Sequence, residues 1–238
     1  MCGLVDAITS ANSNTPIGGC IAGDVNETDT IVLQHLKTYS LSIAAENHSD
    51  GYNGLPSITS YIKIVGCNSS IVRVSASPKF RIFHIANSGN LILEGITLEG
   101  GDNNPWTWPP YKAPPYSGGS IFNRGTVVLN SCTITQSSSI AGGGLYNESG
   151  TSILNDSIIK HNSAVLGGGG IFVENGSATI SHSKISFNRS YDYGGGINNQ
   201  YGTIELSYVT LMDNTAWGSD MFNKNTGGGW VQTHFVAH

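Results

Sequence analysis

Residues 150–175 read GTSILNDSIIKHNSAVLGGGGIFVEN, and residues 176–201 read GSATISHSKISFNRSYDYGGGINNQY. The two segments align without a gap. Related segments begin at Gly125 and Gly202, so four similar units follow one another at intervals of 25, 26 and 26 residues. Repetition at a fixed period of this length is the signature of a solenoid or a related repeat architecture.

Apolar or small residues recur at three matched positions of each unit. The fourth residue after the opening glycine is Leu129, Leu154, Ile180 and Leu206, the seventh is Cys132, Ser157, Ser183 and Val209, and the ninth is Ile134, Ile159, Ile185 and Leu211. Steps of two or three residues are typical of strands separated by a bend, and the spacing of a helix does not fit them.

A glycine-rich element closes the repeat. It spans residues 142–147, 168–173 and 194–199, and an earlier copy spans residues 118–123. Glycine allows the positive φ of a sharp corner, and asparagine tolerates the same region. Stacked asparagines can also form hydrogen-bonded ladders. We predict two such ladders, the first formed by Asn123, Asn147 and Asn223 and the second by Asn162, Asn188 and Asn214.

These patterns predict an all-β fold, a right-handed parallel β-helix. A single coil cannot bury its own apolar positions, whereas coils stacked about 4.8 Å apart form a continuous core and pair each backbone with the next. We place an N-terminal cap at residues 1–30, with a short amphipathic helix from Leu4 to Ala11, and the β-helix at residues 31–238. An insertion at residues 102–117 lengthens one coil.

The chain resembles the right-handed parallel β-helix repeat proteins, the pectin-lyase-like superfamily in the broad sense. The motif Gly118-Gly119-Ser120-Ile121-Phe122-Asn123 and its later copies are similar to repeats of polymorphic outer-membrane and related bacterial surface proteins. The N-terminal run CGLVDAI at residues 2–8, followed by Gly18-Gly19-Cys20, is similar to the cap of extracellular bacterial proteins with such repeats. The resemblance implies the fold but not one activity, because such folds host lyases, hydrolases, isomerases and adhesins.

The composition excludes several classes of protein. Charged residues make up 11% of the 238 residues and the net charge is -5, so we expect no nucleic-acid partner. No stretch of about 20 apolar residues is present, so we expect no membrane insertion. With 39% hydrophobic residues the chain can still bury a core, which excludes a disordered protein.

The cysteines indicate the compartment. The first residues lack the pattern of a secretory signal, so the protein is either intracellular or numbered from a mature boundary. Cys2 and Cys20 bracket a short polar segment, and a disulfide closing it would contribute about 3 kcal/mol and suit an oxidising compartment. We therefore predict this disulfide and a secreted or cell-surface location. Cys67 and Cys132 are predicted to be buried free thiols.

The insertion is the best candidate for a binding site. It reads DNNPWTWPPYKAPPYS, and its proline-rich backbone presents aromatic rings whose flat faces suit sugars or another protein. The predicted ligand-binding residues are Trp106, Trp108, Tyr111 and Tyr116 with the flanking Asp102 and Lys112. The alternative is that the two tryptophans fold back and cover apolar side chains. Later coils carry Ile140, Val165, Tyr191, Tyr193 and Trp217 at the corresponding turn, so an aromatic ridge can run lengthwise.

An enzymatic interpretation requires an acid or base pair near that turn. A polysaccharide lyase needs a basic residue beside a neutralised uronate, often with Ca²⁺, and a hydrolase needs two carboxylates. The weak catalytic candidates are His161, Arg189, Asp192 and Asp213, with Asp102 close to them. His161 and Asp213 occupy equivalent positions two coils apart, about 10 Å, which is too far for a hydrogen bond. No metal-binding or phosphate-binding motif is present, so a cofactor, Ca²⁺, is expected only for a lyase.

The sequence therefore favours a non-enzymatic β-helix module that is secreted or displayed on a cell surface, adhesin-like or structural. Its expected partner is a glycan or a surface protein, bound through the aromatic insertion. The alternative is a polysaccharide lyase or glycoside hydrolase of the pectin-lyase-like superfamily. The low charge and the open ends of a solenoid also make end-to-end self-association possible.

Overall fold

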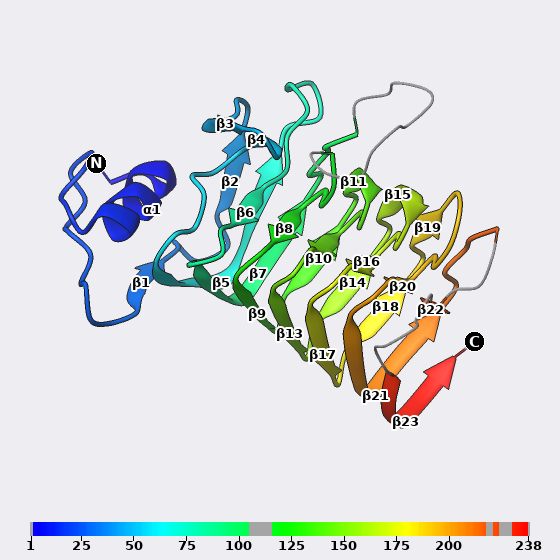
Figure 1. Cartoon of the computed structure of the whole chain (residues 1–238). Helices are drawn as coiled ribbons and strands as arrows, with labels where there is room; N and C mark the ends of the chain where they lie inside the picture. Colours follow the sequence, from blue (N-terminus) through cyan, green and yellow to red (C-terminus); the bar gives the residue numbers. More distant parts are fainter. Residues whose placement is uncertain (1, 105–115, 218–220, 224–229, 238) are drawn as a thin grey trace.

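The computed structural model describes residues 2–104, 116–217, 221–223 and 230–237, with backbone alone for 222–223 and 230–237. The chain forms one N-terminal helix, α1 (Leu4–Ser13), followed by a stack of parallel strands, which confirms the predicted all-β, β-helix class (Figure 1). Three sheets run along the stack, and a small antiparallel hairpin lies outside them.

The largest sheet contains twelve strands: β1 (Asp29–Val32), β2 (Thr38–Leu41), β5 (Tyr61–Arg73), β7 (Asn90–Glu99), β9 (Thr126–Asn130), β10 (Thr133–Thr135), β13 (Thr151–Asn155), β14 (Ile158–Lys160), β17 (Ser177–Ser181), β18 (Lys184–Ser186), β21 (Thr203–Met212) and β23 (Trp230–Ala237). The second sheet contains six strands: β6 (Phe83–Ile85), β8 (Ile121–Asn123), β12 (Leu145–Asn147), β16 (Ile171–Val173), β20 (Ile197–Asn199) and β22 (Met221–Asn223). The third contains β11 (Ser138–Ala141), β15 (Ser163–Gly167) and β19 (Arg189–Ser190), and the hairpin consists of β3 (Glu46–His48) and β4 (Gly51–Asn53).

The register follows the sequence repeat. Leu129 pairs with Leu154, Leu154 with Ile180, and Ile180 with Leu206, as the matched positions require. The glycine-rich corners at Gly142, Gly168 and Gly194 have φ near 60°. Side chains other than glycine occupy two further left-handed corners of each turn, one at Ser131, Asp156, His182 and Tyr208 and one at Gln136, His161, Phe187 and Asp213. The corners thus depend less on glycine and asparagine than the repeat predicts.

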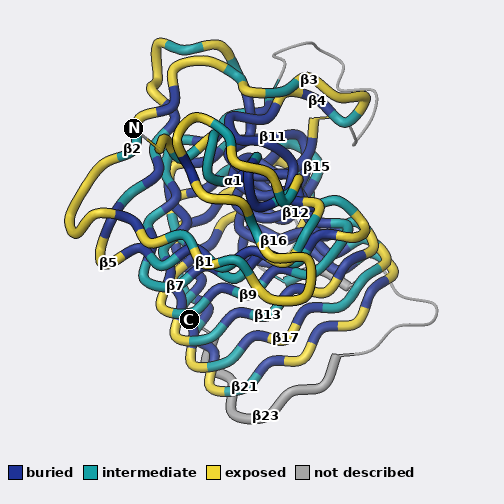
Figure 2. The backbone as a smooth tube through the Cα atoms, turned by 90° about the vertical axis from the view of Figure 1, so that its left-hand side faces the viewer, coloured by how far each residue is buried: buried dark blue, intermediate teal, exposed yellow. Residues whose placement is uncertain are grey.

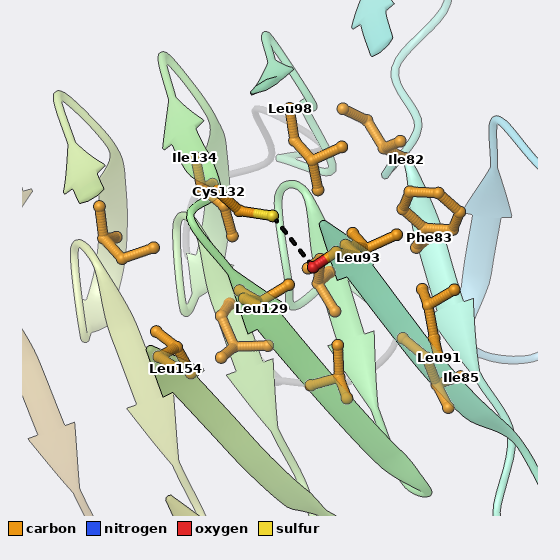
Figure 3. Packing of buried hydrophobic residues seen from close by; sticks show 14 of the residues in the cluster. Ile82, Phe83, Ile85, Leu91, Leu93, Leu98, Leu129, Cys132, Ile134 and Leu154 are labelled. Carbon is orange, nitrogen blue, oxygen red and sulfur yellow. Dashed lines mark hydrogen bonds between the residues drawn. The ribbon is translucent and has the colours of Figure 1, made fainter. Parts of the chain in front are cut away.

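The core is one continuous apolar column inside the stack. It contains the repeated leucine and isoleucine positions, all of them buried, and Figure 3 shows neighbouring coils contributing Leu93, Leu129 and Leu154 to it. Cys132 is buried in the same column, with its sulfur 3.3 Å from the carbonyl oxygen of Leu93 (Figure 3). Burial raises the pKa of this thiol to about 11, so it stays protonated as predicted for a structural cysteine.

The predicted ladder of Asn162, Asn188 and Asn214 is present, whereas the predicted ladder of Asn123, Asn147 and Asn223 is present only between Asn123 and Asn147. Asn162 Nδ2 donates to Asn188 Oδ1, and Asn188 Nδ2 donates to Asn214 Oδ1, each over 3.0 Å. On the other line Asn123 Nδ2 donates to Asn147 Oδ1 over 2.7 Å, but Val173 follows on β16 and interrupts the line before Asn199 and Asn223. The amides of Asn162, Asn188 and Asn214 also donate to backbone carbonyls, whereas the buried Oδ1 of Asn123 has no hydrogen-bond partner.

Helix α1 lies across the N-terminal end of the stack (Figure 2). Its Ile8 and Ala11 belong to the core cluster, in agreement with the predicted amphipathic helix. Cys2 and Cys20 form the predicted disulfide, with their Cα atoms 4.8 Å apart. In the described part of the chain, no helix has both the length and the apolar character needed to cross a bilayer.

The prediction for Cys67 is wrong. Cys67 is a free thiol as expected, but it is exposed. It has φ 46° and lies where the pairing of β5 with β7 shifts register between Val65 and Ser69. The extra residues of β5 at this corner break the alternation that would have turned the side chain inward.

Candidate functional site

The sheet β11–β15–β19 presents a row of outward side chains on each coil. The parallel pairing joins Ser163 to Arg189, and a bridge joins Arg189 to Thr215. Because side chains alternate along a strand, the next outward position is occupied by Tyr191 on one coil and by Trp217 on the following coil. We call the surface formed by His161, Phe187, Arg189, Tyr191 and Trp217 the aromatic face.

The aromatic rings of this face are open to solvent. Trp217 is 95% exposed and Tyr191 is 58% exposed, and Phe187 and Tyr193 are also exposed. The predicted lengthwise ridge is therefore present on its C-terminal coils. It does not extend to Ile140, which is only 2% exposed, so the exposed part of the row is shorter than the sequence indicates.

Two of the rings are held by stacking contacts. His161 stacks on Phe187 on the neighbouring coil, with ring centroids 5.1 Å apart and an interplanar angle of 11°. The guanidinium carbon of Arg189 lies 4.6 Å from the centroid of the Tyr191 ring, a cation–π geometry. These contacts limit the rotation of Phe187 and Tyr191, so their faces are oriented before any ligand arrives.

A carboxyl group follows Tyr191 in the sequence. It belongs to Asp192, whose backbone N–H donates to Ser190 Oγ over 3.2 Å. Partial burial raises the pKa of the Asp192 carboxyl. Arg189 gives the aromatic face hydrogen-bond donors next to flat apolar surface, and the residue after Tyr191 supplies a carboxyl group.

The predicted insertion is attached to the N-terminal end of the same sheet. Asp102 and Ser138 form a backbone bridge, and the N–H of Ile140 donates to the carbonyl of Tyr116 over 2.8 Å. Tyr116 is exposed at this edge. Trp106, Trp108, Tyr111 and Lys112 lie outside the described residues, so their predicted role in binding stays a prediction.

Asp102 has structural partners. Its carboxylate lies 3.4 Å from Lys79 Nζ and 3.7 Å from a guanidinium nitrogen of Arg73, and it is largely buried. This carboxylate therefore holds the base of the insertion on the solenoid. A ligand would have to compete with two cations for it.

The four weak catalytic candidates lie on one side of the molecule but are not arranged as a catalytic pair. Arg189 and Asp192 flank Tyr191, whereas His161 and Asp213 belong to the preceding corner row. Phe187 occupies the position between His161 and Asp213 and stacks on the histidine. The geometry thus favours stacking and hydrogen bonding over proton transfer between these two groups.

The sequence analysis missed a second, buried set of aromatic rings. Phe122, Tyr146 and Phe172 are the middle residues of β8, β12 and β16, and they form a cluster with Ala141 that is separate from the main core. His84 on β6 and His48 on the hairpin extend the row, with neighbouring ring centroids 5.2 to 5.9 Å apart. We call the four buried rings, Phe122, Tyr146, Phe172 and His84, the buried column; His48, whose side chain is 46% exposed, continues the row to the surface. The alternation in each Ile-Phe-Asn motif predicts that the middle ring points away from the core, but not that anything covers it.

Ion pairs surround the buried column. Arg124 binds Asp50 through both of its terminal nitrogens and also binds Glu148 through Nε, and its guanidinium carbon lies 5.1 Å from the Phe122 ring centroid. These hydrogen bonds raise the pKa of Arg124. The guanidinium carbon of Arg81, a fully buried residue, lies 4.7 Å from the same centroid. Burial lowers the pKa of Arg81 to about 9, so the side chain still carries a positive charge near neutral pH.

His84 joins this network to the hairpin. Its Nδ1 lies 2.9 Å from Ser57 Oγ, which in turn lies 2.6 Å from a carboxylate oxygen of Glu46. Its Nε2 is 3.7 Å from Asp50 Oδ2. Burial, with the nearby charge of Arg81, lowers the pKa of His84 to about 4, so the imidazole is neutral at pH 7. Arg81 and His84 are buried, whereas the side chains of Arg124, Glu46 and His48 are 27 to 46% exposed. The hydrogen bonds and ion pairs run among the members of the network, which is typical of a structural cluster.

Among the residues that the structure describes, no three His, Cys, Asp or Glu side chains converge as a metal site would require. Comparisons of the chain with protein-family models, with curated proteins and with solved structures found no match.

Proposed function

We propose that the chain is a β-helix module, secreted or displayed on a cell surface, that binds a glycan on its aromatic face without cleaving it. The observation that carries the proposal is the pair of neighbouring rings on successive coils, Tyr191 and Trp217, the second of them 95% exposed. Large aromatic side chains bury 150 to 250 Å² each when covered, so an uncovered row marks a surface that gains free energy on binding.

The chemistry of the face fits a sugar. A pyranose ring has an apolar face that stacks on an aromatic ring and a rim of hydroxyl groups that need donors and acceptors. Arg189 supplies donors at the Tyr191 ring, and Asp192, the next residue in the chain, supplies a carboxylate acceptor. Because the strands repeat about every 4.8 Å, rings on successive coils offer a row of stacking positions suited to an extended chain better than to one small molecule.

The disulfide between Cys2 and Cys20 is compatible with an extracellular location. We extend the proposal to kinship with the pectin-lyase-like superfamily and its bacterial surface repeat proteins, on the basis of the glycine-rich repeats and the cap. The insertion beside β11 would add further rings to the same binding surface.

A binding assay tests the proposal. Purified protein is titrated with a panel of acidic and neutral polysaccharides, with and without Ca²⁺, by affinity electrophoresis and calorimetry. We expect at least one polysaccharide to bind and the double variant Tyr191→Ala with Trp217→Ala to lose most of that affinity. Tyr61→Ala is the matched control, because Tyr61 is equally exposed but lies on β5, away from the face.

The same samples test cleavage. Unsaturated products at 235 nm and new reducing ends are followed over time. Turnover that disappears in His161→Ala or Asp213→Ala would show that the chain is a lyase or hydrolase and would overturn the non-enzymatic part. Absence of any polysaccharide binding, or equal loss in Tyr61→Ala, would overturn the assignment of the face.

A further inference from the structure

Residues 21–43 carry a concentration of strongly exposed aliphatic side chains, which we call the apolar patch, and no other segment of the described chain has one like it. The five members are aliphatic and 67 to 89% exposed: Ile21, Val25, Val32, Leu36 and Ile43. The other exposed aliphatic side chains among the described residues are Val5, Val74 and Ile158, at 37 to 41%. Scattered single exposures are ordinary, but a concentration of this kind marks an interaction surface.

The patch borders a cavity beside an open strand edge. The cavity is about 300 Å³ and lies between α1, the disulfide-closed segment and β1, with Ala7, Ala11, Ile21 and Val32 among its apolar lining. Strand β1 is the last strand of the large sheet at this end and, in the described structure, pairs only with β5. Its other edge offers unpaired backbone groups to an added strand, the geometry of β-augmentation.

The opposite end of the same sheet offers a strand of matching direction. Strand β23 pairs in parallel with β21 and is the last strand of the sheet among the described residues. Since every pairing in this sheet is parallel, β23 of one molecule runs in the direction that β1 of another requires. Figure 1 shows β1 and β23 at opposite ends of the stack.

The charges of the two ends are also complementary. Residues 21–43, which include all five members of the patch, contain Asp24, Glu27 and Asp29 against one lysine, Lys37, and so have a net negative charge. Residues 221–238 contain Lys224, His234 and His238 and no acidic residue. Opposite charge steers the two ends toward each other and disfavours contacts between like ends.

From these features we propose that the partner of the N-terminal apolar edge is a second copy of this chain, whose strand β23 adds to the open edge of β1. The contact is head-to-tail, so each molecule keeps one free end and the assembly grows as a linear series. Helix α1 covers the N-terminal end of the core, so the coils of the two molecules do not stack directly on each other. The interface consists instead of the β1 edge, the cavity and the exposed aliphatic side chains. The proposal does not depend on the aromatic face.

Sedimentation velocity from micromolar to several hundred micromolar protein tests the association. We expect a concentration-dependent series of oligomers, and a Val32→Lys variant whose apparent dissociation constant is raised at least about tenfold, because the lysine brings an unpaired charge into the interface. Ile158→Lys, an aliphatic position on the same sheet but away from both ends, is the control and should associate like the wild type. A wild-type chain that stays monomeric throughout, or equal effects of the two lysines, would overturn the proposal.

A cross-linking experiment tests the direction of the contact. In a Cys67→Ser background, Thr30→Cys on β1 and Thr233→Cys on β23 are prepared as separate proteins and treated with a short bismaleimide. Cross-linked dimers should form only when the two proteins are mixed. Dimers in the Thr30→Cys sample alone would indicate a head-to-head contact, and no dimers in the mixture would exclude pairing of β1 with β23; either result refutes the head-to-tail arrangement.

Discussion

The buried column and the aromatic face are built by the same repeat, but the rings of the first are buried and those of the second are exposed to solvent. Phe122, Tyr146 and Phe172 point away from the main core on three successive coils, yet none is more than 5% exposed. Tyr191 and Trp217 also point outward on successive coils and remain open to solvent. The difference arises from what lies over each row. The hairpin, Arg81, Arg124 and Ala141 surround the first row, whereas no described residue covers Trp217.

The contrast shows where each row is stabilised. A fully buried phenylalanine contributes about 1.5 to 3 kcal/mol to folding through the area removed from water. The rings of the buried column make this contribution in the free protein. Those of the aromatic face would make it only on binding a ligand. The comparison therefore predicts that substitutions in the column change stability and that substitutions on the face change affinity.

Phe122→Ala should have the largest effect on stability. The substitution removes a ring packed between two guanidinium groups and two neighbouring aromatic residues, and large-to-small changes of this kind cost about 3 to 5 kcal/mol. Guanidinium unfolding followed by circular dichroism measures the loss. A change below about 1 kcal/mol would mean that the column is not part of the cooperative structure.

The second-largest expected effect is a loss of folding stability at low pH, caused by the protonation of His84. The pKa of His84 is about 4 in the folded chain and 6.5 when unfolded, so the unfolded state takes up the proton first. The neutral imidazole therefore favours folding fully above pH 6.5, and stability falls as the pH drops from 6.5 to 4, by about 3 kcal/mol in total. Unfolding curves at several pH values in this window measure the slope.

His84→Asn separates this effect from the general acid response. The asparagine amide can still donate to Ser57 but does not titrate, so the variant should lose most of the slope between pH 6.5 and 4. His182→Gln, at an exposed corner outside the column, should keep the wild-type slope. Equal slopes in all three proteins would contradict the assignment to His84.

Arg124→Gln should cost less, about 2 kcal/mol. It leaves Asp50 and Glu148 without their shared cation at a site that is only partly exposed. Lys63→Gln is the control. Lys63 pairs with Glu94 on the open surface of the large sheet, where such pairs contribute at most about 1 kcal/mol. The two chemical unfolding midpoints, compared at the same salt concentration, test whether the ion pairs of the column are structural.

The repeat predicted the fold because its glycines, its apolar positions and its asparagines all fit the same coil. The opening glycines set the register, the leucine and isoleucine positions filled the core, and Asn162, Asn188 and Asn214 formed the expected ladder. These features depend only on residues one period apart. The disulfide could also be predicted from the sequence, because Cys2 and Cys20 close a short local loop.

Features that depend on contacts between residues far apart in the chain could not be predicted from the sequence. Nothing near Phe122 in the sequence indicates that Asp50, 72 positions earlier, lies over it through Arg124. The exposure of Cys67 was not predicted for a related reason, since Cys67 lies within a register shift of β5 that the regular period does not contain. The sequence predicted the aromatic face as a lengthwise ridge. It did not predict that Ile140 is buried, because that depends on which residues pack against it.

Trp217→Ala should have the smallest effect on folding, within about 0.5 kcal/mol, because its side chain is almost fully solvated in the free protein. Its effect on glycan affinity should be large by comparison, since stacking is the interaction that the exposed ring offers. Chemical unfolding and calorimetric titration of the same preparation give both numbers. A marked loss of stability would mean that the ring packs against the protein in solution, and the contrast between the aromatic face and the buried column would then disappear.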